Sequence, residues 1–222
     1  MFPQVTLIET KLIMIRILIA DDHAIVRKGL KQIILEEYPS AEIGEAGDVE
    51  TLIAFVIKSE WDVILCDISM PGRSGVEALR QVKEINPRIP VLIMSMHPED
   101  QYALRVLKAG ASGYLNKDSV HDDLIKSIQT VLLGRKYITP SIAEKLAGAL
   151  DSDTSKQLHE LLSNREFDVF KMLAGGKSVS DIADQFSLSA TTVSTYRARI
   201  LEKMAMKSNA DLTRYALEKK LI

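Results

Sequence analysis

Three acidic residues in this 222-residue chain lie where phosphoryl chemistry needs them. Asp67 directly follows the apolar run Val63-Ile64-Leu65-Cys66, and Asp21 and Asp22 directly follow the apolar run 17–20. A group of carboxylates without sulfur or imidazole ligands suits a hard divalent cation such as Mg²⁺, or Mn²⁺. An aspartate held beside such a cation can act as the nucleophile of phosphoryl transfer.

Two further polar side chains end apolar runs in the same way. Ser95 follows residues 91–94 and offers a hydroxyl, and Lys117 follows residues 113–116 and offers an ammonium group that could neutralise a phosphoryl oxygen. The alternative for Asp67 alone is structural, because an aspartate at a strand end often caps a helix or accepts hydrogen bonds from loop amides.

The apolar runs read as strands that alternate with amphipathic helices. The chain breaks after Asp67 at Pro71-Gly72, as expected where a strand turns into a helix. Short connections favour an α/β fold with a doubly wound, five-stranded parallel sheet, whose carboxyl ends would gather the four polar positions. We expect strands at 17–20, near Ile43, and at 63–67, 91–95 and 113–116, with helices at 24–36, 51–58, 75–85, 99–109 and 120–133.

This region, from Ile15 to about Arg135, resembles the CheY-like receiver domain of two-component response regulators. The resemblance rests on Asp21-Asp22, Asp67 with Met70-Pro71 and Gly75, Ser95 and Lys117, in the family's order. It implies that Asp67 accepts a phosphoryl group and that Lys117 binds it. It further implies that Ser95 is the switch hydroxyl and Tyr114 the switch aromatic residue. The implied metal ligands are Asp21, Asp22, Asp67 and the Ser69 backbone carbonyl.

The remainder of the chain reads as short helices. Residues 137–157 form an expected linker, with a helix at 138–150 opening at Pro140 and a polar, mobile stretch at 151–156. In residues 158–222, Ser163-Asn164-Arg165-Glu166 matches a capping box, and helices at 178–186 and 190–204 are joined by a three-residue turn. Such a pair indicates a smaller, all-α helix-turn-helix domain.

The third of these helices has one apolar and one polar face. Val193, Tyr196, Ile200 and Met204 recur at helical spacing and define the buried stripe. A small, polar and partly basic opposite face can enter the major groove of DNA, although a helical protein-interaction module would show a similar pattern. The predicted DNA-binding residues are Thr191, Thr192, Ser194, Thr195, Arg197, Ala198, Arg199 and Lys203.

This segment resembles the LuxR-type domain of NarL/FixJ response regulators. That resemblance makes the third helix the recognition helix and gives a fourth helix, at about 209–219, a part in dimerisation. Tyr196 stands where many members have His, and Ser194 and Ala198 stand where some carry Lys. The matching residues are Leu162-Ser163-Asn164-Arg165-Glu166, Ile182-Ala183, Leu188-Ser189, Thr192-Val193, Ile200 and Lys203-Met204.

Composition agrees with an acidic site followed by a nucleic-acid binder. Residues 158–222 hold ten basic and eight acidic side chains, hence +2, against −2 for the whole chain. The single Cys66 and the absence of a secretory signal favour the cytoplasm, and Lys11 and Arg16 interrupt the only apolar N-terminal stretch, so no contact with a membrane is expected. Residues 1–14 form an N-terminal extension, either a tail or an early start with Met14 as the true initiator.

Together these features predict a response regulator with receiver domain 15–136. A sensor histidine kinase, or a small phosphodonor, would phosphorylate Asp67, and the product would favour a homodimer on double-stranded promoter DNA, with RNA polymerase as a further partner. No independent enzymatic turnover is expected. The rivals are a Mg²⁺-dependent phosphatase and a constitutive DNA binder with a degenerate receiver. His23, His97, His121 and His159 read as surface or packing residues.

Overall fold

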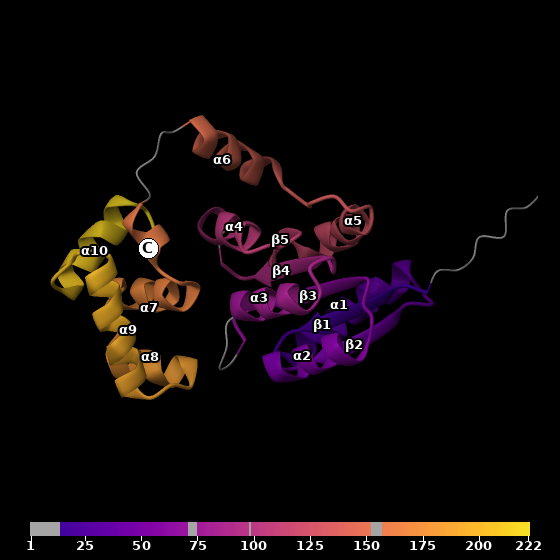
Figure 1. Ribbon diagram of the computed structural model, residues 1–222, viewed down its shortest axis with the longest axis horizontal. Coiled ribbons are helices and arrows are strands. Elements are labelled where there is room, and N and C mark those ends of the chain that lie inside the picture. The colour runs from indigo at the N-terminus through magenta and orange to yellow at the C-terminus, as the bar shows by residue number, and fades with distance from the viewer. Residues whose placement is uncertain (1–13, 71–74, 98, 152–156) are drawn as a thin grey trace, which may run out of the picture.

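A computed structural model describes residues 14–70, 75–97, 99–151 and 157–222 (Figure 1). Three expected features therefore lie outside the described residues, wholly or over most of their length: the N-terminal extension 1–14, the Pro71-Gly72 break and the polar stretch 151–156. The described chain forms an α/β domain followed by a helical domain, as the sequence predicts. No helix of the described part is long and apolar enough to cross a membrane.

The first domain is built on a five-stranded parallel sheet with the order β2-β1-β3-β4-β5. The expected strands are confirmed, and the sequence had no direct signal for this order. The register pairs Ala20 with Cys66, Asp67 with Met94 and Ser95 with Asn116, so the carboxyl ends of the strands lie level. The strands are β1 (Arg16–Ala20), β2 (Glu42–Ala46), β3 (Val63–Asp67), β4 (Val91–Ser95) and β5 (Gly113–Asn116).

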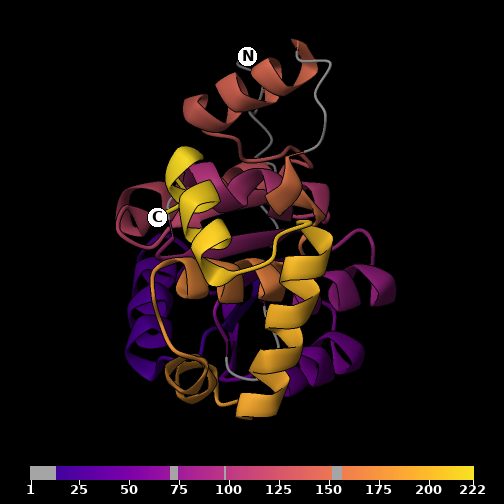
Figure 2. The same ribbon diagram turned by 90° about the vertical axis from the view of Figure 1, so that its left-hand side faces the viewer.

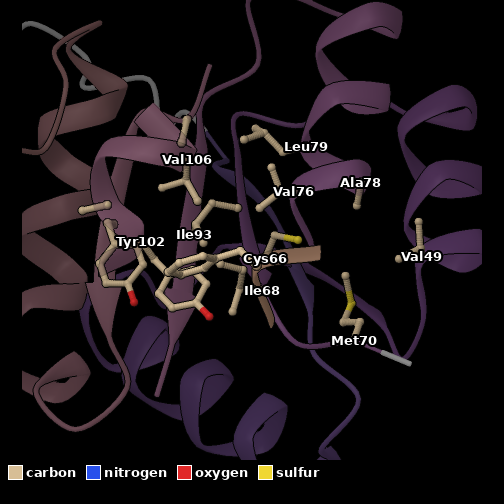
Figure 3. Close-up of a cluster of buried hydrophobic side chains, with 14 of the residues drawn as sticks. Val49, Cys66, Ile68, Met70, Val76, Ala78, Leu79, Ile93, Tyr102 and Val106 are labelled. Atoms are coloured by element: carbon tan, nitrogen blue, oxygen red, sulfur yellow. The ribbon is translucent and has the colours of Figure 1, made fainter. Parts of the chain in front are cut away.

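Helices cover both faces of the sheet because alternate residues of each buried strand point to opposite sides. Ile17, Ile19 and Leu65 pack with the helices α1 and α5 on one face, whereas Leu18, Ile64 and Cys66 pack with α2, α3 and α4 on the other. In Figure 3, Cys66, Val76, Leu79, Ile93 and Val106 lie together in this second layer. The helices are α1 (Ala24–Glu37), α2 (Val49–Lys58), α3 (Gly75–Ile85), α4 (Glu99–Lys108) and α5 (Val120–Leu132).

Helix boundaries follow local capping. The sequence predicted that α2 begins near Thr51, but it begins at Val49 because the carboxylate of Asp48 accepts a hydrogen bond from the Thr51 amide. The predicted capping box is present, since Ser163 and Glu166 exchange hydrogen bonds at the start of α7 (Asn164–Ala174). The same arrangement opens α8 (Val179–Phe186) and α10 (Asn209–Glu218).

The linker contains α6 (Pro140–Asp151), which packs on α4 and buries Ile142 (Figure 1). A short 3-10 helix, η1 (Leu158–Leu161), precedes α7 and was not predicted, because four residues carry no helical periodicity. Between α8 and α10 runs α9 (Ala190–Lys203), the helix with the expected polar face. In α9, Val193 and Ile200 are buried as predicted and Tyr196 is half-buried; Met204, which directly follows the helix, is also buried as predicted.

The two domains are in contact through α4 and α7. The Tyr102 hydroxyl donates a 2.6 Å hydrogen bond to Oδ1 of Asp168, and Arg105 donates to the backbone carbonyls of His159 and Leu162. The Arg105 guanidinium also lies 4.1 Å from the centre of the Phe167 ring. In Figures 1 and 2, α9 and α10 lie on the side of the helical domain away from the sheet.

Candidate phosphorylation site and candidate DNA-binding surface

The polar residues predicted for the site lie at one edge of the sheet. Asp67 ends β3 with 2% of its surface exposed, and Asp21 directly follows β1 and is fully buried. Lys117 directly follows β5 and bridges the two, with Nζ 2.6 Å from Oδ2 of Asp21 and 3.0 Å from Oδ1 of Asp67. The parallel register and three strand ends thus place a cation between two buried carboxylates.

The electrostatics of this cluster follow from burial and pairing. Burial raises the pKa of Asp67 above its ordinary value; Lys117 opposes this shift, and the nearby Asp21 carboxylate reinforces it. Burial alone would lower the pKa of Lys117, but its hydrogen bonds to Asp21 and Asp67 outweigh that effect and raise it. The lysine therefore stays charged, and the buried Asp67 carboxylate has a permanent cation beside it.

The backbone after β3 has almost no room for a side chain. Gly75 opens α3 and its amide donates to the carbonyl of Ile68, at 2.9 Å. A Cβ atom at Gly75 would lie 2.0 Å from the Asp67 carbonyl oxygen, well inside the closest real contacts. Glycine at position 75 thus lets the helix start directly beside Asp67, which explains why this residue type belongs to the motif.

The predicted switch residues meet at His97. Ser95 is fully buried, and its Oγ accepts a hydrogen bond from the His97 amide at 3.0 Å. Tyr114 is also fully buried, and its hydroxyl donates to the His97 carbonyl at 2.6 Å. The His97 ring stacks on Tyr102, with ring centres 4.6 Å apart. A path of direct contacts therefore runs from Ser95 to Tyr102, the residue that holds Asp168 of the helical domain.

A metal ion could bind beside Asp67. Asp21, Asp22 and His23 place ligand atoms within 4.8 Å of one another. Oδ1 of Asp22 is shielded from solvent and accepts no hydrogen bond, although Nδ1 of His23 lies 2.7 Å away. His23, expected to be a surface or packing residue, is exposed. Ser69, predicted to offer its carbonyl, is exposed at the rim of the same site.

On the second domain, most residues of the predicted DNA-binding face of α9 are open to solvent. Thr191, Ser194, Thr195, Ala198 and Arg199 are exposed. Thr192 and Arg197 are half-buried, and Lys203 is exposed.

Two of the predicted phosphate-binding cations have partners within the domain. Nε of Arg197 donates to Asn209 of α10 at 2.7 Å, and Nζ of Lys203 lies 2.7 Å from the Glu166 carboxylate of α7. Both contacts fix the tilt of α9 against its neighbouring helices.

Local sequence gave no signal for the residues at the contact between the domains. Tyr102, Arg105 and Asp168 were not singled out, because a tyrosine, an arginine and an aspartate on helices are ordinary surface residues. Tyr102 and Asp168 are 66 residues apart in the chain, so their hydrogen bond becomes visible only in the docked arrangement of the two domains.

Comparison with known proteins agrees with both halves of the chain. Residues 17–129 match the family model described as response regulator receiver domain, and residues 160–216 match that of bacterial regulatory proteins, luxR family. The chain is 35% identical over 205 residues to the response regulator GacA of Pseudomonas viridiflava, covering 92% of this chain and 96% of the relative. It is 31% identical to the response regulator UvrY of Escherichia coli K12, covering 92% and 94%.

Among solved structures, it is similar to RcsB of Salmonella enterica serovar Typhimurium bound to the promoter P1flhDC with the phosphomimetic BeF3⁻. The TM-score is 0.56 and the identity 26%, over 91% of this chain and 97% of that one. The chain therefore belongs to the two-component response regulators that join a receiver domain to a domain of the luxR family.

Proposed function

We propose that Asp67 is the phosphoryl acceptor of this response regulator and that its phosphorylation controls how the second domain binds promoter DNA. The single observation that carries the proposal is the Lys117 ammonium held between the buried carboxylates of Asp67 and Asp21. A sensor histidine kinase is the expected donor. The Asp67 oxygen would bond to phosphorus while the bond from phosphorus to the kinase's imidazole nitrogen breaks, and Lys117 would compensate the added charge.

The residues beside Asp67 fit a divalent cation, Mg²⁺ or Mn²⁺. Asp22 offers a carboxylate oxygen that is shielded from solvent, and Asp21, Asp67 and the Ser69 carbonyl complete an all-oxygen set. When bound, the cation supplies charge neutralisation for the phosphoryl oxygens. Removing Asp22 should therefore weaken phosphorylation while leaving the Lys117 bridge in place.

Phosphorylation would act on the second domain through His97. A phosphoryl group on Asp67 offers the Ser95 hydroxyl a stronger acceptor, so Ser95 would release the His97 amide and Tyr114 would move with it. Because His97 stacks on Tyr102, this rearrangement would disturb the Tyr102–Asp168 hydrogen bond and shift the population away from the docked state. The undocked domains are then free to pair as a homodimer.

The exposed face of α9 supports binding to double-stranded DNA. RcsB, the structural relative described above, was solved on a promoter. We propose the same use for α9, with Ser and Thr side chains at base edges and Arg199 at phosphates. RNA polymerase would be a further partner at the promoter. We also propose a cytoplasmic location, supported by the buried free thiol of Cys66, and no turnover of an independent substrate.

The domain limits belong to the same proposal: receiver 15–136, linker 137–157 and LuxR-type domain 158–222. The position of α6 between the two folded units supports them.

The test compares wild type with Asp67→Asn, using Asp118→Asn as a control because Asp118 is exposed and lies next to Lys117 in the chain. We expect an acid-stable, base-labile phosphoryl group on wild type and on the control, and none on Asp67→Asn. Beryllofluoride with magnesium should tighten binding to promoter DNA at a fixed salt concentration in the same two proteins only. Phosphoryl incorporation into Asp67→Asn would overturn the assignment.

A further inference from the structure

A cavity of about 630 Å³ lies between the two domains, and its wall has two chemically different halves. The receiver contributes Asp22 and Ser69 of the phosphorylation site, together with His97. The LuxR-type domain contributes cations that include Arg165 and Lys177. The docked helical domain thus encloses a space that opens on Asp22 and Ser69, the neighbours of the buried Asp67 in the proposed site.

Arg165 is the most unusual residue of this wall. Only 7% of its surface is exposed, and its guanidinium lies 4.0 Å from the centre of the Phe186 ring, which also lines the cavity. Its Nη2 atom is shielded from solvent and makes no hydrogen bond. A charged donor that is buried without an acceptor is costly, and an anion in the cavity would satisfy it.

Cationic side chains outnumber acidic side chains on the cavity wall. Lys171 and Lys177 join Arg165 on the wall, against the carboxylates of Asp22 and Asp168. Asp168 already accepts the hydrogen bond from Tyr102, and Asp22 belongs to the proposed metal site. The basic half of the wall therefore faces the phosphorylation site with at least one donor, Arg165, still unsatisfied.

The size of the cavity selects the ligand. A volume of this order holds a small molecule, whereas a kinase domain could not enter it. We propose that Arg165, assisted by Lys171 and Lys177, binds the phosphoryl group of a small phosphodonor in the docked state. The luxR-family domain would then supply part of the donor site for Asp67. This inference rests on the proposed function, because it assumes Asp67 as the acceptor.

The transfer balances with phosphoramidate as the donor. Phosphoramidate reacts as its zwitterion, whose nitrogen already carries three protons. An oxygen of the Asp67 carboxylate bonds to phosphorus, the phosphorus–nitrogen bond breaks with its electron pair on nitrogen, and ammonia leaves. No further proton is needed. Arg165 does not react in this step; it holds phosphoryl oxygens and is a binding residue.

The test measures phosphorylation of the full chain as a function of phosphoramidate concentration, with magnesium present. Arg165→Gln should raise the half-saturating concentration about tenfold, the usual effect of losing one charge-assisted hydrogen bond. The exposed Lys177→Gln should raise it roughly twofold, because solvent screens that charge. Arg165→Lys, which keeps the charge, should fall between wild type and Arg165→Gln. Arg214→Gln and Lys207→Gln, exposed and outside the cavity wall, are the matched controls and should leave it unchanged.

A second measurement separates this site from the acceptor itself. Inorganic phosphate is titrated into the Asp67→Asn variant by calorimetry, with and without the Arg165→Gln change. Binding that depends on Arg165 supports the anion site even if Asp67 proves not to be the acceptor. Conversely, failure of wild type to be phosphorylated by any donor would refute the proposed function and leave this titration to decide the site.

Two results would overturn the inference. The first is a half-saturating phosphoramidate concentration that stays unchanged in a folded Arg165→Gln or Lys177→Gln protein, or that falls in it because the domains have opened. The other is a shortened lifetime of phosphorylated Asp67 with unchanged donor saturation, which would mean that these cations act on the attached phosphoryl group and bind no free donor.

Discussion

The hydrogen bond between Tyr102 and Asp168 should hold the two domains together, and Tyr102→Phe should weaken that contact. Tyr102 is 1% exposed and its hydroxyl lies 2.6 Å from Oδ1 of Asp168. Burial raises the pKa of Asp168, and the hydrogen bond from Tyr102 opposes that shift by stabilising the charged carboxylate. Phenylalanine keeps the ring contacts with His97 and Phe167 and removes only the donor.

The magnitude follows from the type of hydrogen bond. A short hydrogen bond to a charged acceptor contributes about 2 kcal/mol, which corresponds to a shift of roughly 30-fold in the ratio of docked to undocked molecules. Arg105 keeps its hydrogen bonds to the carbonyls of His159 and Leu162, so the docked state should survive in weakened form.

The assay is native-state hydrogen exchange of the η1 and early α7 amides, which report the undocked fraction even when it is small. We expect their protection to fall by the same roughly 30-fold factor, with the radius of gyration from small-angle scattering rising if undocked molecules become abundant. Tyr137→Phe is the matched control, because the Tyr137 hydroxyl, at the start of the linker, donates to Asp123 of α5 at 2.8 Å and does not join the two domains. Unchanged protection in Tyr102→Phe, or an equal loss in the control, would refute the reasoning.

Three further changes test the receiver and the domain contact. Gly75→Ala should destabilise the protein by at least about 3 kcal/mol in urea unfolding, because its Cβ would overlap the Asp67 carbonyl. Gly29→Ala is the control: a Cβ there meets nothing within 4 Å, so the change should stabilise the protein by up to about 1 kcal/mol. Equal effects of the two changes would contradict the packing argument. Lys117→Met should slow phosphorylation of Asp67 at least tenfold by rapid quench, and a wild-type rate would exclude the lysine from the reaction. Burial lowers the pKa of His159 to about 4, so the folded state favours the neutral imidazole. The contribution of His159 to the free energy of unfolding should be fully present above about pH 6.5 and fall by about 1 kcal/mol toward pH 4, after allowing for the partial exposure of the ring. Urea unfolding at each pH should show a smaller decline for His159→Gln.

The sequence alone determined the sheet and the position of its site. Apolar runs of four residues fix buried strands, and a polar residue directly after such a run must lie at the carboxyl edge of a parallel sheet. Asp67, Ser95 and Lys117 could be placed in this way because each signal is local to its own strand end. The capping box at Ser163 was readable for the same reason.

The tertiary structure decided which of these groups touch. Sequence indicated that Lys117 could reach a phosphoryl oxygen, but its bridge between Asp21 and Asp67 depends on the order of β1, β3 and β5 in the sheet. Likewise, Lys203 was expected to hold DNA phosphates, and the packing of α9 on α7 gives it Glu166 as a partner.

The docking of the domains is the feature furthest from the sequence. Tyr102 and Asp168 lie on the facing surfaces of two units, and the helical periodicity of neither unit says which surfaces will meet. A few hydrogen bonds and ring contacts decide that arrangement, and they join residues far apart in the chain. The cavity lined by Asp22 and Ser69 of one unit and by Arg165 of the other exists only because of this docking.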